Sequence, residues 1–477
     1  MADTDISVPI QAPPEQTMKK KFNFWTALGI ALCCSGAWEG WVASMAQGIV
    51  AGGSVGLFWG WIFVSIGITF MACALAELVS MWPSAGGQYV WAAELAPKKY
   101  KAFIINVLVI VMWVVVNIFY VRAMHWMNES ILYIHVVGYF VVIITLAVCT
   151  DNKHDAKYVF TNFENNSGWE QDGVAWCVSL LPALYAFFSL DTAAHYSEEI
   201  TNADVAVPRA MYLQAVINSL MTIPFVITVL FCIGDPIDVL FNSQIGFTSP
   251  FTQIVLKSTG SPAAAIILNA ISTYIAFAAG LDLWGATARA MWSLARDGGL
   301  PQLFSRIHPK YDVPIPAILV TLPPSLIIIM LYIFNSTAFY GIMAGVLVAF
   351  QLSYVIPIAL HLFHARRKSS LSPGRWSMGR FGVVCDIVAL TFGCFMIIVM
   401  SFPTYQPVTA STMNYAVAII GAIVIFATVL YFAYARGRYA GPATVLDAVR
   451  VVSNAALDIA VESDDTSTKL KVEPKMA

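Results

Sequence analysis

Long apolar runs, separated by short polar segments, fill the chain from residue 24 to residue 435. About eleven of them approach the roughly 20 residues that a helix needs to cross a bilayer. A spanning segment must satisfy its own backbone hydrogen bonds, and these runs are too long for barrel strands, so we predict helices. The expected spans are 24–50, 56–81, 102–122, 131–150, 174–196, 212–233, 263–291, 314–334, 338–363, 381–402 and 415–435. The pattern predicts an all-α polytopic membrane protein.

The composition supports this fold class and excludes several functions. Of the 477 residues, 58% are hydrophobic and 11% are charged, whereas soluble domains carry about 25% charged residues. The net charge of −2 and the lack of a long basic block argue against a nucleic-acid partner. The eight cysteines form no CxxC pair, so we expect no disulfide framework, no metal and no cofactor.

The chain divides into three parts by hydropathy and charge. We expect a cytosolic N-terminal tail at 1–22, a transmembrane domain at 23–436 and a cytosolic C-terminal tail at 437–477. Both tails are polar and low in aromatic residues, which is typical of solvated, unpacked segments. The N-terminal tail ends in Lys19–Lys21, and such positive residues favour the cytosolic side.

The basic loops reveal an irregularity in this topology. Three expected spans separate Lys101 from Arg209, and an odd number would place these two basic segments on opposite faces. Every other interval between basic segments holds an even number of spans. Either one run within 102–196 does not cross, or one span is absent from this chain.

Two of the spans have sequences that favour an interrupted helix. Ser35, Gly36 and Gly40 bracket the acid Glu39 in the middle of the first span, and a second candidate break lies at Ser189. Unwound backbone at membrane depth is tolerated only where it lines a cavity or is buried in protein. Freed N–H groups attract a carboxylate, whereas an intramembrane acid attracts an ammonium group or a cation. Paired interruptions of this kind indicate a transporter site.

Three ionisable groups follow the second break at regular spacing. Asp191, His195 and Glu199 stand at i, i+4 and i+8, so a continuous helix would align them on one face. Ionisable groups beside lipid are costly, so this face is expected to look into a bundle or a watery path. The pattern indicates passage of a solute, not bond making.

Each of these residues also has a structural interpretation. Function is the favoured interpretation of Glu39, with a buried acid paired with an Arg or a hydroxyl as the alternative, and His195 is either functional or a packing histidine. Glu199, with its neighbour Glu198, lies where a solvated helix end is expected, and His361 and His364 are interpreted as interfacial residues, not metal ligands.

The aromatic residues and one charge pair each allow a functional and a structural interpretation. An aromatic cage for a cationic amine and plain packing are alternatives for Trp38, Trp41, Phe187, Phe188 and Trp284. Asp282 and Arg289 share a helical face and form either a structural pair or a coupling pair.

Several motifs together resemble the fungal amino-acid, GABA and choline permeases of the amino acid–polyamine–organocation superfamily. They are Ala76-Glu-Leu-Val-Ser-Met-Trp-Pro-Ser-Ala-Gly-Gly-Gln-Tyr89, the run 166–176, Ser197-Glu198-Glu199 followed by Val207-Pro208-Arg209, and Ala295-Arg-Asp-Gly-Gly-Leu-Pro301. The resemblance covers roughly 22–436 and implies an inverted-repeat (LeuT-like) transporter with two five-helix repeats and two peripheral helices.

The resemblance also implies the site. The predicted substrate-binding residues are Ser35, Gly36, Ala37, Trp38, Glu39, Gly40, Phe187, Phe188, Ser189 and Asp191. Proton coupling is likewise implied by the family, with Glu39, Asp191, His195 and Glu199 as candidates. The family commonly has Gly-Phe-Asp at the second break, where this chain has Ser189-Leu190-Asp191.

The resemblance departs most at the third helix. After Ala102-Phe103 the chain passes almost directly into a segment that resembles the family's fourth helix. We therefore expect about 11 spans here against 12 in the family, through a splice variant or a faulty gene model. This departure lies in the same interval, between Lys101 and Arg209, that holds an odd number of expected spans.

These observations predict a multi-pass transporter of the plasma membrane. It would import an amino acid or small amine (GABA-, amino-acid- or choline-like) with a proton, by alternating access, with membrane lipid around it. The alternatives are a non-transporting nutrient receptor or an inactive variant, because one helix is missing. No nucleophile–base set in the sequence recommends an enzyme.

Overall fold

The computed structural model describes residues 23–81, 83, 91, 124–241, 249–308, 313–321, 323–324, 336–365, 374–409 and 412–439. The expected span 102–122 and the question of the missing helix lie outside these residues, as do nearly all of both predicted tails.

The described residues form α-helices and no β-strand, which confirms the all-α class. The longer helices are α1 (Phe24–Ser35), α2 (Ala37–Met81), α5 (Met124–Cys149), α10 (Ala203–Cys232), α13 (Pro262–Arg296), α16 (Ser336–Leu360), α17 (Phe381–Val399) and α18 (Ala416–Leu430). Shorter helices are α6 (Ala156–Thr161), α7 (Asp172–Val178), α8 (Leu181–Tyr185), α9 (Thr192–His195), α11 (Pro236–Phe241), α12 (Pro250–Thr259) and α14 (Ile315–Val320). Single turns are the 3₁₀ segments η1 (Ser197–Glu199) and η2 (Gln302–Ser305) and the π segments η3 (His361–Ala365) and η4 (Tyr431–Ala435).

Membrane-spanning length is reached by five helical stretches within the described part of the chain. They are Phe24–Met81, Ala203–Cys232, Ile342–Phe363, Phe381–Val399 and Ala416–Ala435. The expected spans 131–150 and 263–291 correspond to α5 and α13, whereas 174–196 is divided among α7, α8 and α9. The long loop expected after residue 233 contains α11 and α12.

Local sequence explains where several helices begin. Asn23 caps α1 by accepting a hydrogen bond from the Thr26 backbone N–H at 3.0 Å. Ser261 caps α13 in the same way at Ala264, and Pro262 occupies the first helical position, where its missing N–H costs nothing.

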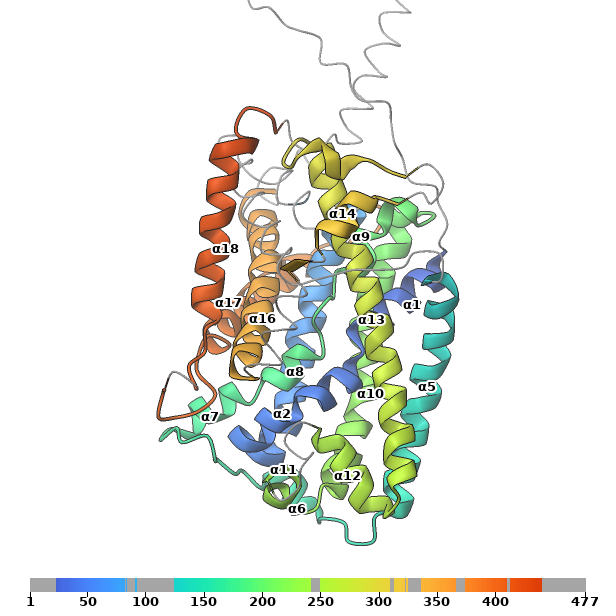
Figure 1. Cartoon of the computed structure of the whole chain (residues 1–477), viewed down its shortest axis with the longest axis vertical. Helices are drawn as coiled ribbons and strands as arrows, with labels where there is room; N and C mark the ends of the chain where they lie inside the picture. Colours follow the sequence, from blue (N-terminus) through green and yellow to red (C-terminus); the bar gives the residue numbers. More distant parts are fainter. Residues whose placement is uncertain are drawn as a thin grey trace, which may run out of the picture.

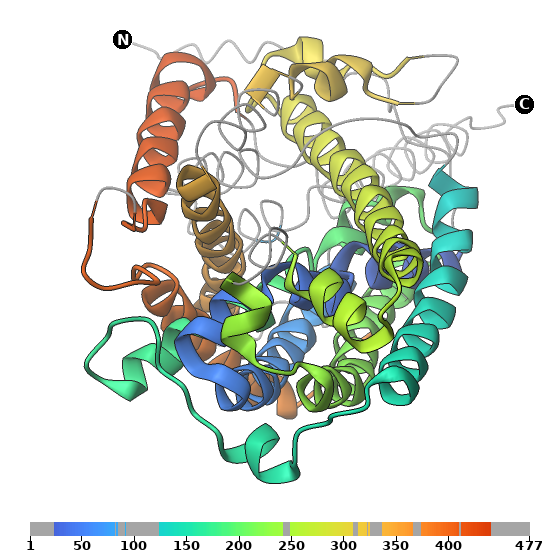
Figure 2. The same ribbon diagram turned by 60° about the horizontal axis from the view of Figure 1, so that its bottom comes forward.

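The helices stand side by side in two groups (Figure 1). α10 packs along α2, and α5, α13 and α1 gather around them. On the other side α17 packs against α2 and α16, and α18 packs against α16 at the edge (Figure 2). The core therefore centres on α2, which contacts helices of both groups.

The outer helices expose apolar side chains instead of polar ones. Val148 on α5 is 74% exposed and Ile425 on α18 is 67% exposed, and their neighbours on the same faces are similar. Apolar faces of this extent are unfavourable in water but normal in a bilayer. The exposed surface therefore agrees with a multi-pass membrane protein.

Gly53 divides α2 into two arms. Its backbone is non-helical, at φ 54° and ψ −150°, a conformation that side-chain-bearing residues rarely adopt. A Cβ at this position would also lie 3.1 Å from the Glu164 backbone nitrogen. The expected span 24–50 thus comprises α1 and the first arm of α2, and the expected span 56–81 is the second arm.

We predict that Gly53→Ala destabilises the protein by about 1–3 kcal/mol, because alanine is strained in this conformation. Gly421→Ala is the matched control, since Gly421 lies inside α18 with no atom within 4 Å of an added Cβ. This control is expected to be neutral or to stabilise by about 0.5–1 kcal/mol. Thermal unfolding of the purified protein in detergent measures both, and equal midpoints would contradict the assignment of strain to Gly53.

Candidate functional site

The first interruption is a single residue between α1 and α2. Gly36 adopts the left-handed conformation, at φ 44° and ψ 54°, and donates its N–H to the Leu32 carbonyl at 3.2 Å. The helix restarts at Ala37, so the N–H groups of Ala37, Trp38 and Glu39 have no acceptor within α2. The interruption expected in the first span is confirmed, and it leaves a helix N-terminus deep in the bundle.

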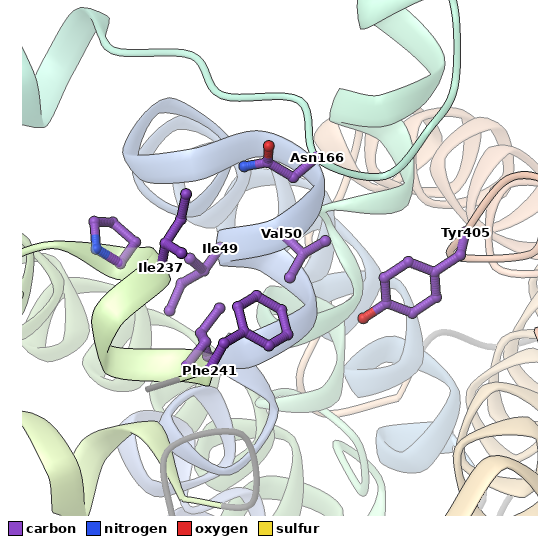
Figure 3. Close-up of a pocket in the computed structure, with 8 residues that line it drawn as sticks. Ile49, Val50, Asn166, Ile237, Phe241 and Tyr405 are labelled. Carbon is purple, nitrogen blue, oxygen red and sulfur yellow. The ribbon is translucent and has the colours of Figure 1, made fainter. Parts of the chain in front are cut away.

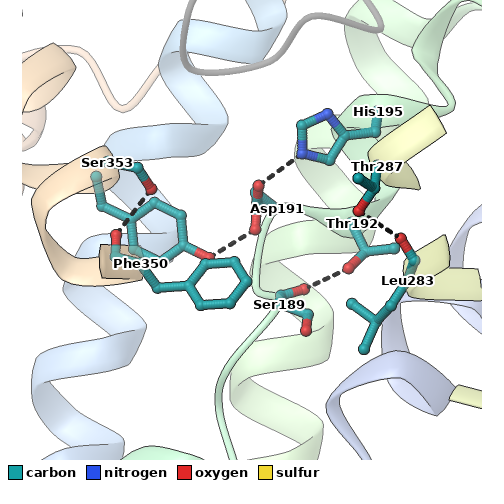
Figure 4. Close-up of polar contacts among 9 residues, drawn as sticks. Ser189, Asp191, Thr192, His195, Leu283, Thr287, Phe350 and Ser353 are labelled. Atoms are coloured by element: carbon teal, nitrogen blue, oxygen red, sulfur yellow. Dashed lines mark hydrogen bonds and ion pairs between the residues drawn. The ribbon is translucent and has the colours of Figure 1, made fainter. Parts of the chain in front are cut away.

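The second interruption lies between α8 and α9. Ser189 has a positive φ of 68°, which is uncommon for a residue with a side chain. Its carbonyl accepts from the Thr192 N–H at 3.1 Å and from the Thr192 hydroxyl at 2.9 Å (Figure 4). The break expected at Ser189 is therefore confirmed, and Thr192 satisfies the carbonyl that the break releases from the helix.

These two interruptions lie next to each other. A Cβ added to Gly40 would come within 3.1 Å of the Ala186 Cα, so the two backbones approach closely at this point. α1 also packs against α9. A Cβ at this distance would be a tight contact, so the close approach of the two backbones favours glycine at position 40.

Glu39 is paired with a histidine from another helix. The Glu39 carboxylate is buried, and its Oε1 lies 2.8 Å from Nδ1 of His135 on α5. The Glu39 Oε2 and the His135 Nε2 have no hydrogen-bond partner among the described residues. His135 was not among the predicted site residues, although an ionisable residue inside an apolar run is a sufficient signal.

Asp191 forms the centre of a second polar group (Figure 4). Its Oδ2 lies 2.8 Å from Nε2 of His195, and its Oδ1 accepts a hydrogen bond from the Tyr354 hydroxyl at 2.6 Å. All three side chains are buried. Tyr354 comes from α16, far away in the sequence, and no spacing pattern links it to Asp191.

Glu199 departs from the expected alignment. α9 ends at His195 and Glu199 follows in the separate turn η1, so no continuous helix carries the three ionisable groups. Glu199 is 1% exposed and forms an ion pair with Arg289 of α13. The expectation of a solvated helix end is therefore wrong for Glu199, because a buried arginine compensates its charge.

The guanidinium of Arg289 connects this ion pair to its surroundings. It lies 4.1 Å from the centre of the Tyr196 ring and donates to the Gly285 carbonyl at 3.0 Å. The Tyr196 hydroxyl in turn donates to the backbone carbonyl of Asp282 at 2.9 Å. Arg289 thus joins α13 to the segment after α9.

The aromatic residues of the proposed cage pack against different neighbours. Trp38 lies 5.1 Å from Phe225, and Phe187 stacks on Trp61 at 4.9 Å between ring centres. Phe188 stacks on Tyr185 at 5.1 Å. These contacts match the packing alternative.

The other predicted residues have polar partners of their own. The Ser35 hydroxyl accepts a hydrogen bond from the amide of Gln214 on α10. His361 is 5% exposed, with Nδ1 3.0 Å from Asp386 Oδ2, so the interfacial interpretation of His361 is wrong. His361 is buried beside Asp386 of α17, and this burial is the reason that it does not lie at an interface.

A cavity of about 190 Å³ lies away from the two interruptions (Figure 3). It is lined by α2, α11, the loop before α7 and the loop before α18, and its walls are mainly apolar. Its lining residues are Ile49, Val50, Asn166, Pro236, Ile237, Leu240, Phe241 and Tyr405. None of these residues belongs to the predicted substrate site.

Comparisons with known proteins give a consistent result. The family model described as amino acid permease matches residues 94–425. The choline transporter of Saccharomyces cerevisiae is 29% identical, over 91% of this chain and 84% of the relative. Amino-acid permease 2 of Neurospora crassa is 27% identical (89% and 87%), and the GABA-specific permease of S. cerevisiae is 26% identical (91% and 84%).

We predict that Arg289→Gln destabilises the protein by about 3–5 kcal/mol, because it leaves the Glu199 charge buried without its partner. Lys257→Gln is the control, since the Lys257–Asp238 pair has side chains that are 37% and 43% exposed and is worth about 0–1 kcal/mol. Thermal unfolding in detergent measures both variants. Similar losses in the two would contradict a special role for the buried pair.

Proposed function

The chain belongs to the amino acid permease family and is a membrane transporter, and on this basis we propose that it imports an amino acid or a small amine. GABA-like, amino-acid-like and choline-like solutes are the candidate substrates, as the names of its relatives indicate. The observation that carries the proposal is the adjacency of two interrupted helices, each with a buried acid beside the break. Such paired breaks are typical of a site that opens alternately to the two sides.

The first interruption supplies complementary groups for a zwitterion. The N–H groups of Ala37 and Trp38 begin a helix, where the dipole and the unpaired donors favour a carboxylate. The Glu39 carboxylate favours an ammonium or a quaternary amine. The second interruption, with Phe187, Phe188 and Ser189, would form the opposite wall of the same site.

Buried acid–histidine pairs support proton coupling. In each of Glu39–His135 and Asp191–His195 a carboxylate oxygen lies 2.8 Å from an imidazole nitrogen, so the two members can share a proton. A cationic substrate group that approaches Glu39 competes with that proton, which links binding to proton release. Glu199, held by Arg289, would be the fixed end of the path.

Charge distribution supports an orientation in the plasma membrane with both termini cytosolic. The positive-inside rule assigns basic loops to the cytosol, and these loops include the segments that carry Arg296, Arg306 and Arg375. The exposed apolar faces of α5 and α18 would then contact lipid.

We predict that uptake of radiolabelled substrate by cells expressing the chain falls when a protonophore is added. The panel consists of GABA, choline and neutral amino acids, each with unlabelled competitors. Glu39→Gln is expected to reduce uptake at least about tenfold, because a charge-assisted contact is worth about 1.5–3 kcal/mol. His135→Gln is expected to flatten the pH dependence.

Glu170→Gln serves as the control for these variants, because Glu170 lies in an exposed loop and is expected to leave uptake unchanged. Wild-type uptake that is insensitive to the protonophore would remove the proton step. Uptake by Glu39→Gln at the wild-type level would remove Glu39 from the site.

A non-transporting receptor is the second candidate, because the sequence lacks the segment that resembles the family's third helix. Saturable binding of a panel member to purified protein, without flux into proteoliposomes, would favour the receptor. Flux into proteoliposomes would exclude both the receptor and the inactive variant.

A further inference from the structure

A second polar cluster lies at the far end of α2 from the interruption at Gly36. Glu77 near the end of α2, His361 at the start of η3 and Asp386 on α17 come together from three segments. One candidate ligand atom from each lies within 4.8 Å of the others. The side chains are buried, at 4%, 5% and 0% exposure. Three ionisable groups therefore share one enclosed space.

The imidazole of His361 is aimed into this space. Its Nδ1 lies 3.0 Å from Asp386 Oδ2, but the direction of approach leaves Nδ1 without a hydrogen-bond partner among the described residues. His361 opens a π turn, which replaces the α-helical spacing at this point. Single π turns are frequent at functional sites, because they redirect a side chain.

Glu77 is held in place by a neighbouring loop. Its Oε1 accepts hydrogen bonds from the Met378 N–H at 2.8 Å and from the Ser377 hydroxyl at 3.0 Å. One turn later, the Ser80 hydroxyl accepts from the Trp376 N–H at 2.7 Å. These bonds orient the carboxylate as outer hydrogen bonds orient metal ligands.

Two thiols lie beside the carboxylates. Cys73 precedes Glu77 by one helical turn, and Cys385 directly precedes Asp386. Both are buried, and the two thiols lie within hydrogen-bonding reach of each other. Soft sulfur next to imidazole and carboxylate favours a borderline-soft cation over magnesium or calcium.

We propose that Glu77, His361 and Asp386 bind a divalent cation of the zinc class. Imidazole nitrogen and carboxylate oxygen are both ligands of zinc, and water or a thiol would complete a four-coordinate site. Zinc bonds of about 2.0–2.2 Å need only a modest contraction of the cluster. The ion would join α2 to α16 and α17, so the proposal extends beyond the transport site and does not depend on it.

The test uses the purified, tag-free full-length protein, stripped with a chelator and then incubated with zinc. Elemental analysis after gel filtration is expected to find about one zinc per chain in the wild type and a clear loss in H361Q and D386N. H308Q is the matched control, because His308 lies in a separate loop, and it is expected to keep the metal. Wild type without zinc, or H361Q with as much as wild type, would overturn the proposal.

Cobalt(II) binding tests the metal site in the wild-type protein alone, so the result does not depend on whether a variant folds. A four-coordinate site with nitrogen and oxygen ligands is expected to give intense visible absorption that zinc abolishes, and a thiolate charge-transfer band would add Cys385. Weak octahedral absorption alone would overturn the site. Failure of transport leaves these measurements untouched, so the two proposals fail separately.

Discussion

The need to satisfy backbone polar groups away from water governs this structure. An apolar bundle tolerates a broken helix only if the groups released at the break find partners or face a ligand. At Gly36 the break is reduced to one left-handed residue, whose N–H still reaches the Leu32 carbonyl. At Ser189 the released carbonyl is taken by both donors of Thr192. The first N–H groups of α2 have no acceptor within their own helix, and the backbone of α2 comes close to the segment before the second break at Gly40 and Ala186.

Buried charged side chains also need partners in this bundle. A buried carboxylate is stable only when it is protonated, paired or bound to a cation. Glu199 is paired with Arg289, Glu39 with His135, and Asp191 with both His195 and Tyr354. The arginine pair joins a carboxylate to a guanidinium, whereas the other two pairs join a carboxylate to an imidazole.

The packing of α2 brings these features into one frame. Its first arm begins at the interruption, Gly53 redirects the chain, and its second arm ends beside Glu77. α10 and α17 pack on different sides of it. A movement of α2 during transport would therefore affect both the site at Gly36 and the cluster around Glu77.

Sequence alone was sufficient for the features that depend on local chemistry. The all-α class follows from the lengths of the apolar runs, and the two breaks follow from Gly36 and from the polar residues after Phe188, because propensity and hydropathy act over a few neighbouring residues. Only the tertiary structure decided the partners. Spacing placed Glu199 in line with Asp191 on a continuous helix, yet the chain turns after His195 and Glu199 meets Arg289. His135, Tyr354 and the meeting of Glu77 with His361 and Asp386 were also out of reach, because contacts between distant helices depend on how whole helices pack and no short-range pattern records them.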